Sequence, residues 1–233
     1  MKAMIGILGG MGTMAGINLA HMLAAEAVKR GAVSDSDFPR FMLYNIPAEG
    51  MDECGVNDEA KILPQIEEGR HRLVNAGCAI LIIACNSIHA LTHPMSKIPM
   101  ARQINLVEEA CIQVPKGIRT IGVIGSSYTK DTGLYTARLT EMGINVVNTN
   151  HEEQTKLDNA IKAVMTSLPP KDKFYADIAY ACNGMKNRGA KTIIIGCTEL
   201  SVYFQPVTNP VGIIDAGYAA VCKALDIAEA ITE

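Results

Sequence analysis

The sequence has no apolar stretch that approaches the roughly 20 residues of a membrane-spanning helix. Its richest apolar runs, Ala79–Ala84 and Thr192–Ile195, have the length of strands. The apolar stretch that follows Lys2 is broken by Gly6 and Gly9, which favours a buried first strand over a signal peptide. We therefore expect a cytoplasmic protein without a membrane partner.

Runs of lysine or arginine are also missing, and the formal net charge of the 233 residues is −3. Nucleic acids are bound mainly through clustered cationic side chains, so this composition argues against a nucleic-acid partner. The chain is 48% hydrophobic and 19% charged, which is typical of a globular protein that buries a core.

No C-x-x-C pair occurs among the seven cysteines, and without a signal sequence we expect a reducing compartment and free thiols. Five of the cysteines lie in polar or helical stretches and are interpreted as small, semi-buried residues: Cys54, Cys78, Cys111, Cys182 and Cys222. Cys85 and Cys197 differ, because each directly follows an apolar strand and precedes residue types that begin helices.

Apolar runs rich in Ile and Val alternate with helical patterns along the chain. The predicted strands are Ala3–Leu8, Arg40–Asn45, Ala79–Ala84, Thr120–Ile124, Asn145–Val147 and Lys191–Ile195. The predicted helices are Thr13–Arg30, Asp58–Asn75, Leu106–Val114, Thr132–Glu141, Asp158–Leu168, Lys173–Arg188 and Ala216–Ile231, with a polar loop over Leu168–Lys173. Strands buried on both faces that alternate with helices indicate an α/β fold with parallel sheets.

The order of the motifs repeats. A strand runs into a small-residue turn near Gly10 and, 75 residues later, another strand ends at Cys85; the same order runs from Gly125 to Cys197 over 72 residues. Chance matches between apolar strands are common, but an ordered match of two motif types favours a duplication.

We expect two similar α/β halves, one comprising residues 1–102 plus 209–233 and the other residues 103–208. Ligands of parallel sheets bind at the carboxyl ends of strands. Cys85 and Cys197 are therefore predicted on opposite walls of a cleft between the halves.

A thiol at a helix start lies near the positive end of the helix dipole, which predicts a lowered pKa for Cys85 and Cys197. Either residue alone is equally well explained as a small buried hydrophobe. Two thiols at matching positions suit a reaction in which a proton leaves one side of a carbon and another arrives on the opposite side. Inversion of an amino-acid Cα requires this arrangement.

Four segments, in order along the whole chain, carry a family resemblance: Gly9-Gly10-Met11-Gly12, Cys85-Asn86-Ser87 with His89, Gly125-Ser126 with Thr129, and Gly196-Cys197-Thr198-Glu199. They resemble the aspartate/glutamate racemase superfamily, specifically its aspartate racemase branch. Related glutamate racemases would have His in place of Glu199.

The resemblance implies two pseudo-symmetric flavodoxin-like halves and a PLP-independent, cofactor-free racemase that is a homodimer acting on a small amino acid. It implies that Cys85 and Cys197 are the two catalytic bases. The implied substrate contacts are Met11, Gly12, Thr13, Asn86, Ser87, Ser126, Thr129, Thr198 and Glu199. For Glu199 the sequence leaves open a helix-dipole role, a contact to the substrate ammonium, or orientation of the neighbouring thiol.

One segment departs from the family pattern. Many aspartate racemases have a Pro-Asp-Arg turn after the second strand, where this chain has Ile46-Pro47-Ala48-Glu49. The missing arginine makes a neutral or longer substrate credible beside aspartate, with Lys130 or Arg40 as other candidate cations.

The i, i+4 pair His89 and His93 has no third ligand and precedes Pro94, so no metal site is expected. His89 remains a candidate cation beside Cys85, which would depress the pKa of that thiol. Two further hypotheses remain beside the amino-acid racemase: an isomerase of the hydantoin racemase or maleate isomerase type, in which one cysteine acts as nucleophile, and a non-catalytic amino-acid-binding paralogue.

Overall fold

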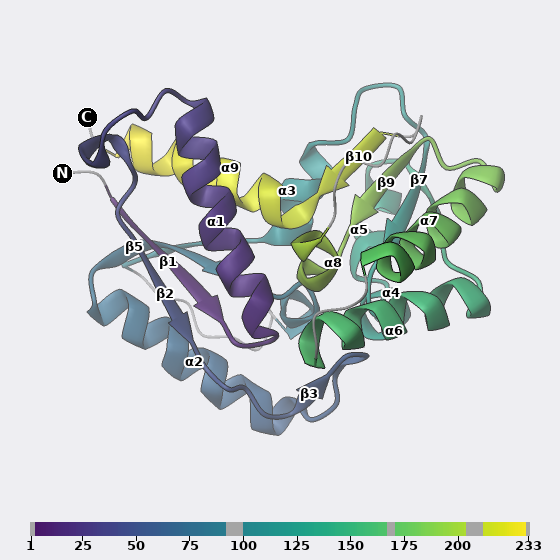
Figure 1. The fold of residues 1–233 in the computed structure, drawn as a ribbon, viewed down its shortest axis with the longest axis horizontal. Coiled ribbons are helices and arrows are strands. Elements are labelled where there is room, and N and C mark those ends of the chain that lie inside the picture. The colour runs from purple at the N-terminus through teal and green to yellow at the C-terminus, as the bar shows by residue number, and fades with distance from the viewer. Residues whose placement is uncertain (1–2, 92–99, 167–170, 204–211, 232–233) are drawn as a thin grey trace.

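Two four-stranded parallel sheets form the two lobes of the computed structural model, which describes residues 3–91, 100–166, 171–203 and 212–231 (Figure 1). The first sheet contains β1 (Met4–Gly9), β2 (Phe41–Asn45), β5 (Cys78–Ile83) and β6 (Arg102–Ile104), and the second contains β7 (Thr120–Ile124), β8 (Asn145–Val147), β9 (Thr192–Ile195) and β10 (Gly212–Asp215). Their orders, β2-β1-β5-β6 and β8-β7-β9-β10, are equivalent. The predicted pseudo-symmetric, flavodoxin-like halves with parallel sheets are confirmed.

Helices cover both sheets. They are α1 (Thr13–Lys29), α2 (Glu59–Asn75), α3 (Leu106–Ile112), α4 (Ser127–Asp131), α5 (Leu134–Glu141), α6 (His151–Thr166), α7 (Lys171–Asn187), α8 (Thr198–Val202) and α9 (Ala216–Ala230), with the short 3-10 helices η1 (Asp35–Asp37) and η2 (Ser87–Leu91). A small hairpin, β3 (Met51–Asp52) and β4 (Gly55–Val56), precedes α2. Among the helices of the described ranges, none is long and apolar enough to cross a membrane.

The side chains of β5 alternate between two parts of the core. Ile80 and Ile82 belong to the cluster between the lobes, whereas Leu81 and Ile83 pack on the other side of the sheet with residues of α2. The same central cluster contains Ile194 of β9, so the two halves share one core. Burial on both faces explains why these strands were recognisable as continuous apolar runs.

The end of the chain links the two halves. β10 hydrogen-bonds to β9 in the second sheet, yet it continues directly into α9, which packs against α1 and β5 of the first half. The division predicted from the sequence, 1–102 plus 209–233 and 103–208, places α9 with the lobe that it covers but separates residues 212–215 from the sheet in which they pair. That division stays a prediction, because strand pairing and helix packing divide the chain at different residues.

Helices α6 and α7 begin earlier than predicted. α6 begins at His151, not Asp158, because a capping box precedes it: the Asn150 side chain accepts from the Glu153 N–H at 2.9 Å, and the Glu153 carboxylate accepts from the Asn150 N–H at 2.8 Å. The predicted loop is wrong for its last three residues, since α7 begins at Lys171.

Candidate active site

A small cavity lies where the loops after β5 and β9 meet, and Cys85 and Cys197 both line it. Its volume is about 20 Å³, enough for about one water molecule. Both thiols are buried, with 4% and 6% of each residue exposed. The structure therefore brings the two predicted cysteines to the wall of one cavity, each from the equivalent strand of its sheet.

Cys85 lies two residues before η2. Backbone N–H groups of Ser87 and Ile88 and the Ser87 hydroxyl favour its thiolate, but burial and the negative charge of Glu199 outweigh them. The pKa of the Cys85 thiol is raised to about 12, with burial as the largest cause.

Cys197 has a carboxylate as its direct partner. Its Sγ donates to Oε2 of Glu199 at 3.3 Å. Burial is the largest cause that raises the pKa of Cys197 well above its usual value, followed by the charge of Glu199. Burial also raises the pKa of Glu199 to about 7, so this carboxyl group gains and loses its proton near neutral pH.

The position of Glu199 requires the glycine turn after β1. A Cβ atom at Gly12 would lie 2.4 Å from Glu199 Oε1, and the backbone of Gly12 has a φ of 30°. The same oxygen has no hydrogen-bond partner among the described residues although it is buried. Gly12 thus leaves room for a carboxylate oxygen that is free to bind a ligand.

The predicted lowering of the pKa of both thiols is wrong for this closed cavity. Backbone N–H groups at the helix starts do act in the predicted direction. However, η2 and α8 are only five residues long, and loss of hydration of the thiolate outweighs their effect.

Three hydroxyl groups connect the two halves beside the cavity. Ser87 Oγ lies 3.2 Å from Ser126 Oγ and 3.5 Å from Thr129 Oγ1, and Ser126 and Thr129 are 3.1 Å apart. A fourth contact joins the cysteine loops themselves, because the Thr198 hydroxyl donates to the Ala84 carbonyl at 3.1 Å. These groups fix the relative position of the loops that carry the thiols.

Asn86, next to Cys85, is held from the other half of the protein. The hydroxyl of Tyr135 on α5 donates to Asn86 Oδ1 at 2.5 Å. Asn86 lines the cavity and is 2% exposed, and its Nδ2 has no partner among the described residues. The side chain therefore has a spare hydrogen-bond donor at the cavity.

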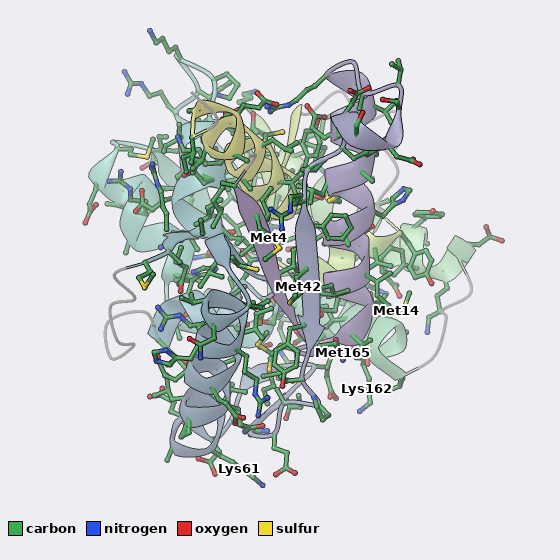
Figure 2. All side chains as sticks on the ribbon, turned by 90° about the vertical axis from the view of Figure 1, so that its left-hand side faces the viewer. Met4, Met14, Met42, Lys61, Lys162 and Met165 are labelled. Carbon is green, nitrogen blue, oxygen red and sulfur yellow. The ribbon has the colours of Figure 1, made fainter. Side chains whose placement is uncertain are left out.

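The hairpin β3–β4 covers the cavity and was not predicted. The N–H of Tyr128 donates to the Cys54 carbonyl at 2.9 Å, and Lys162 on α6 binds Glu53 at 2.7 Å. Lys162 and Met165, one turn apart on α6, lie on the same side of the molecule in Figure 2. In this arrangement the hairpin leaves no room beneath it for a ligand much larger than a water molecule.

Seven of the predicted site residues line the cavity: Met11, Cys85, Asn86, Ser87, Ser126, Cys197 and Glu199. Six lining residues were missed, namely Met51, Asp52, Glu53 and Gly55 on the hairpin and Ile161 and Met165 on α6. Gly50 and Gly55 around Asp52 are turn signals that could have indicated the hairpin.

The other predicted contacts lie outside the cavity wall. Gly12 packs on Glu199, Thr129 supports Ser126, and Thr198 bonds to the Ala84 carbonyl. The Thr13 hydroxyl accepts from Asn45 Nδ2 at 3.3 Å. Their roles toward a substrate stay a prediction.

Glu49, which replaces the expected arginine, does not line the cavity. It is paired with Lys61 at 2.7 Å, and its side chain is 65% exposed. Arg40 and Lys130, the other candidate cations, are not among the lining residues either. Among the described lining residues, Asp52, Glu53 and Glu199 are acidic and none is Lys, Arg or His. The Asp52 carboxylate accepts from the Cys54 N–H and from Asn57 Nδ2 within the hairpin segment.

Of the two histidines in the predicted i, i+4 pair, the structure describes only His89. His93 lies outside the described residues. Burial lowers the pKa of His89 to about 4, so it is neutral near pH 7 and the hypothesis of a cationic His89 beside Cys85 is wrong. Within the described ranges, no group of three or more His, Cys, Asp or Glu residues is placed to hold a metal ion.

Comparisons with known proteins identify the family. The family model Asp/Glu/Hydantoin racemase matches residues 8–224. The broad specificity amino-acid racemase RacX of Bacillus subtilis is 24% identical over 225 residues, which cover 91% of this chain and 92% of that protein.

Solved structures share the fold. An aspartate racemase from Picrophilus torridus superposes with a TM-score of 0.83 at 24% identity, covering 97% of this chain and 94% of that one. An aspartate racemase homologue from Pyrococcus horikoshii gives 0.73 at 20% identity, covering 98% and 100%. With a family model that spans nearly the whole chain and the expected fold, the protein belongs to the Asp/Glu/hydantoin racemase family and is an isomerase of the amino-acid racemase type.

Proposed function

We propose that this racemase inverts the Cα of a free amino acid with Cys85 and Cys197 as its two acid/base residues. One observation carries the proposal: both thiols line the same cavity and come from equivalent loops of two pseudo-symmetric halves. A proton removed by one thiolate is replaced by the proton of the other thiol from the opposite side. Reversal of the two roles converts the mirror-image substrate.

The surrounding groups suit the charges of this reaction. As the Cα proton leaves, charge moves into the substrate carboxylate, and hydrogen-bond donors there become more stabilising. Asn86 Nδ2 and the hydroxyls of Ser87 and Ser126 are the donors at the cavity. Stabilisation of that developing charge lowers the barrier to proton removal.

A thiolate must form before the Cα proton can be taken. The resting thiols are protonated because burial raises the pKa of both. A bound substrate ammonium places a positive charge nearby, which favours the thiolate. At Cys197, the Sγ–H proton moves to Glu199 Oε2, so the carboxylate becomes a carboxylic acid as the thiolate forms.

We propose that neutral or cationic side chains are preferred over that of aspartate. Asp52 and Glu53 line the cavity without a lining Lys, Arg or His among the described residues, and like charges repel. Lys162 neutralises Glu53, which leaves the charge of Asp52 in excess. The name of the Bacillus subtilis relative, a broad specificity racemase, is in keeping with this view.

The decisive test is Cα exchange in deuterated water without added PLP. L- and D-forms of aspartate, glutamate, alanine, methionine and lysine are incubated separately, and optical rotation and mass are followed. We expect deuterium incorporation together with loss of rotation, faster for alanine, methionine or lysine than for aspartate. Binding without exchange of any of these amino acids would favour the non-catalytic paralogue, and a preference for aspartate would overturn the proposed selectivity.

We further propose that the protein is a homodimer of the cytoplasm. β2 is an edge strand of the first sheet, and it carries the partly exposed apolar residues Phe41 and Met42, the latter labelled in Figure 2. Strand edges with exposed apolar side chains are commonly covered by a partner. Light scattering on the purified chain should give twice the mass of one subunit, and Met42→Lys should shift it toward the single chain.

A further inference from the structure

Tyr135 is a buried side chain that connects the two cysteine loops. It is 2% exposed, it lies on α5 of the second half, and its hydroxyl donates to Asn86 Oδ1 of the first half. Its ring packs against the other loop, because a Cβ atom at Gly196 would lie 2.6 Å from Tyr135 Cε2. One side chain thus contacts both the residue after Cys85 and the residue before Cys197.

In the structure, the acceptor end of the Asn86 amide is turned toward the Tyr135 hydroxyl. An asparagine amide has an acceptor end and a donor end. The Tyr135 hydroxyl occupies the acceptor end, so the donor end, Nδ2, is left over at the cavity without a partner among the described residues. A buried donor without a partner is unfavourable, and a ligand that accepts its hydrogen bond removes that penalty.

We propose that Tyr135 is a positioning residue that fixes the Asn86 amide with Nδ2 directed at the substrate carboxylate. This inference rests on the proposed racemase function. If the hydroxyl is removed, the amide can turn its oxygen toward the cavity. The substrate carboxylate then meets an acceptor instead of a donor, most unfavourably when enediolate charge develops on it.

The test is a double-mutant cycle with Tyr135→Phe and Asn86→Ala. We expect Tyr135→Phe to fold and to lower kcat/KM at least tenfold, with most of the loss in kcat, since the contact strengthens as charge develops. In the Asn86→Ala background, Tyr135→Phe should have no further effect on kcat/KM. Equal effects in both backgrounds, or no effect in either, would overturn the proposal.

A matched control separates the positioning role from general loss of stability. The Tyr218 hydroxyl also makes a 2.5 Å hydrogen bond, to Glu26, but it lies outside the cavity wall. Tyr218→Phe should therefore leave kcat/KM within twofold of the wild type, even if it lowers the melting temperature as much as Tyr135→Phe does. A tenfold loss in Tyr218→Phe would show that kcat/KM reports stability, and the proposal would be rejected.

If Tyr135→Phe does not fold, Asn86→Asp takes its place. Its carboxylate still accepts from the Tyr135 hydroxyl but offers the cavity no donor, so we expect a folded protein with at least a tenfold loss of kcat/KM. Unchanged kcat/KM would overturn the proposal. Failure of the wild type to racemise any amino acid would instead reject the proposed function, which keeps the two failures distinct.

Discussion

The two halves have equivalent strands and loops, but the surroundings of their cysteines differ. Cys197 donates to the carboxylate of Glu199, two residues further along. Cys85 has the hydroxyl of Ser87 and two backbone N–H groups instead, and its equivalent loop contains no carboxylate. Among the described residues, Glu199 of the second half is therefore the group beside a thiol that can accept a proton near pH 7.

In the proposed mechanism, a duplicated scaffold would therefore carry two unequal bases. In that mechanism, Cys197 passes its proton to Glu199 before the substrate reacts, whereas Cys85 needs the charge of the bound substrate to become a thiolate. The symmetric fold places the thiols, and the asymmetric neighbours determine how each one ionises. Five experiments test or refine this comparison.

Replacement of the thiols has the largest expected effect. Cys85→Ser or Cys197→Ser should each lower racemisation by about a thousandfold, because a hydroxyl is a far weaker acid and general acid–base groups contribute about 10²–10⁴. Each variant should still exchange the Cα proton of one enantiomer, and the two variants should retain opposite enantiomers. Mass spectrometry in deuterated water measures this.

Cys182→Ser is the matched control for these variants. Cys182 is buried to a similar degree but belongs to the core beneath α6 and α7, outside the cavity wall. Its turnover should stay within twofold of the wild type. Normal turnover in Cys85→Ser or Cys197→Ser would remove that residue from the mechanism.

Glu199→Gln tests the asymmetry directly. The variant keeps the shape of the side chain but no longer accepts a proton from Cys197, so we expect kcat to fall by about ten- to a hundredfold. Because the equilibrium constant of racemisation is one, kcat/KM must fall equally in both directions. The asymmetry should appear in Cα exchange, which slows more for the enantiomer whose proton faces Cys197.

The same variant changes the pH profile. Since the pKa of Glu199 is about 7 and its ionised form is the acceptor, wild-type kcat should rise as the pH increases through 7. The rise should be absent in Glu199→Gln. An identical profile in both proteins would mean that another group controls the ionisation.

The stability of the fold should respond to Glu199 in the opposite sense. The pKa of Glu199 is about 7 in the folded protein, against an ordinary value of 4.5 that applies to the unfolded chain. Between these two pH values, only the folded state holds the proton. Stability from this group is therefore present below pH 4.5 and is lost as the pH rises through 7, by roughly 3 kcal/mol.

Urea unfolding of the wild type and Glu199→Gln at pH 4.5 and pH 8 measures that loss. The stability of the variant relative to the wild type should grow by about 3 kcal/mol between the two pH values. Glu49→Gln is a suitable control, because Lys61 lowers the pKa of this exposed carboxyl and no such growth is expected. A constant difference for Glu199→Gln would show that Glu199 is not buried as a carboxylate.

The sequence predicted the parts of this site that depend on local pattern. Buried strands are continuous apolar runs, and Cys85 and Cys197 follow two of them, so their meeting at one edge followed from strand direction. The hairpin was missed because Met51–Asp52 and Gly55–Val56 are too short to show a period of two. The strands β6 and β10 were missed because they lack a continuous apolar run: β6 begins with Arg102 and Gln103, and β10 has only two apolar residues between Gly212 and Asp215.

The sequence pattern could not predict contacts between residues that lie far apart in the chain. Tyr135 is a normal apolar position of an amphipathic helix, and its partner Asn86 lies 49 residues earlier. The ionisation of the thiols was predicted in the wrong direction because burial, which dominates it, depends on the closed cavity. Glu49 was singled out because it stands in the segment where the family pattern has an arginine, but its side chain is paired with Lys61 at the surface.

The smallest expected effect concerns the ion pair that joins the hairpin of the first half to α6 of the second. Lys162→Met frees the Glu53 carboxylate at the cavity, and Lys61→Met breaks a pair of equal length, 2.7 Å, within the first half. Figure 2 shows the two lysines at separate places on the surface. Exposed ion pairs contribute little to stability, so both variants should unfold nearly as the wild type does.

The two variants should differ in substrate preference. With Glu53 no longer neutralised, Lys162→Met should lower KM for lysine a few-fold and raise it for aspartate, whereas Lys61→Met should change neither. The difference should shrink in high salt, because screening weakens charges near the surface. If both variants shift KM alike, the ion pair across the cavity has no special role, and the hairpin of the first half acts as a passive cover over the thiols of both.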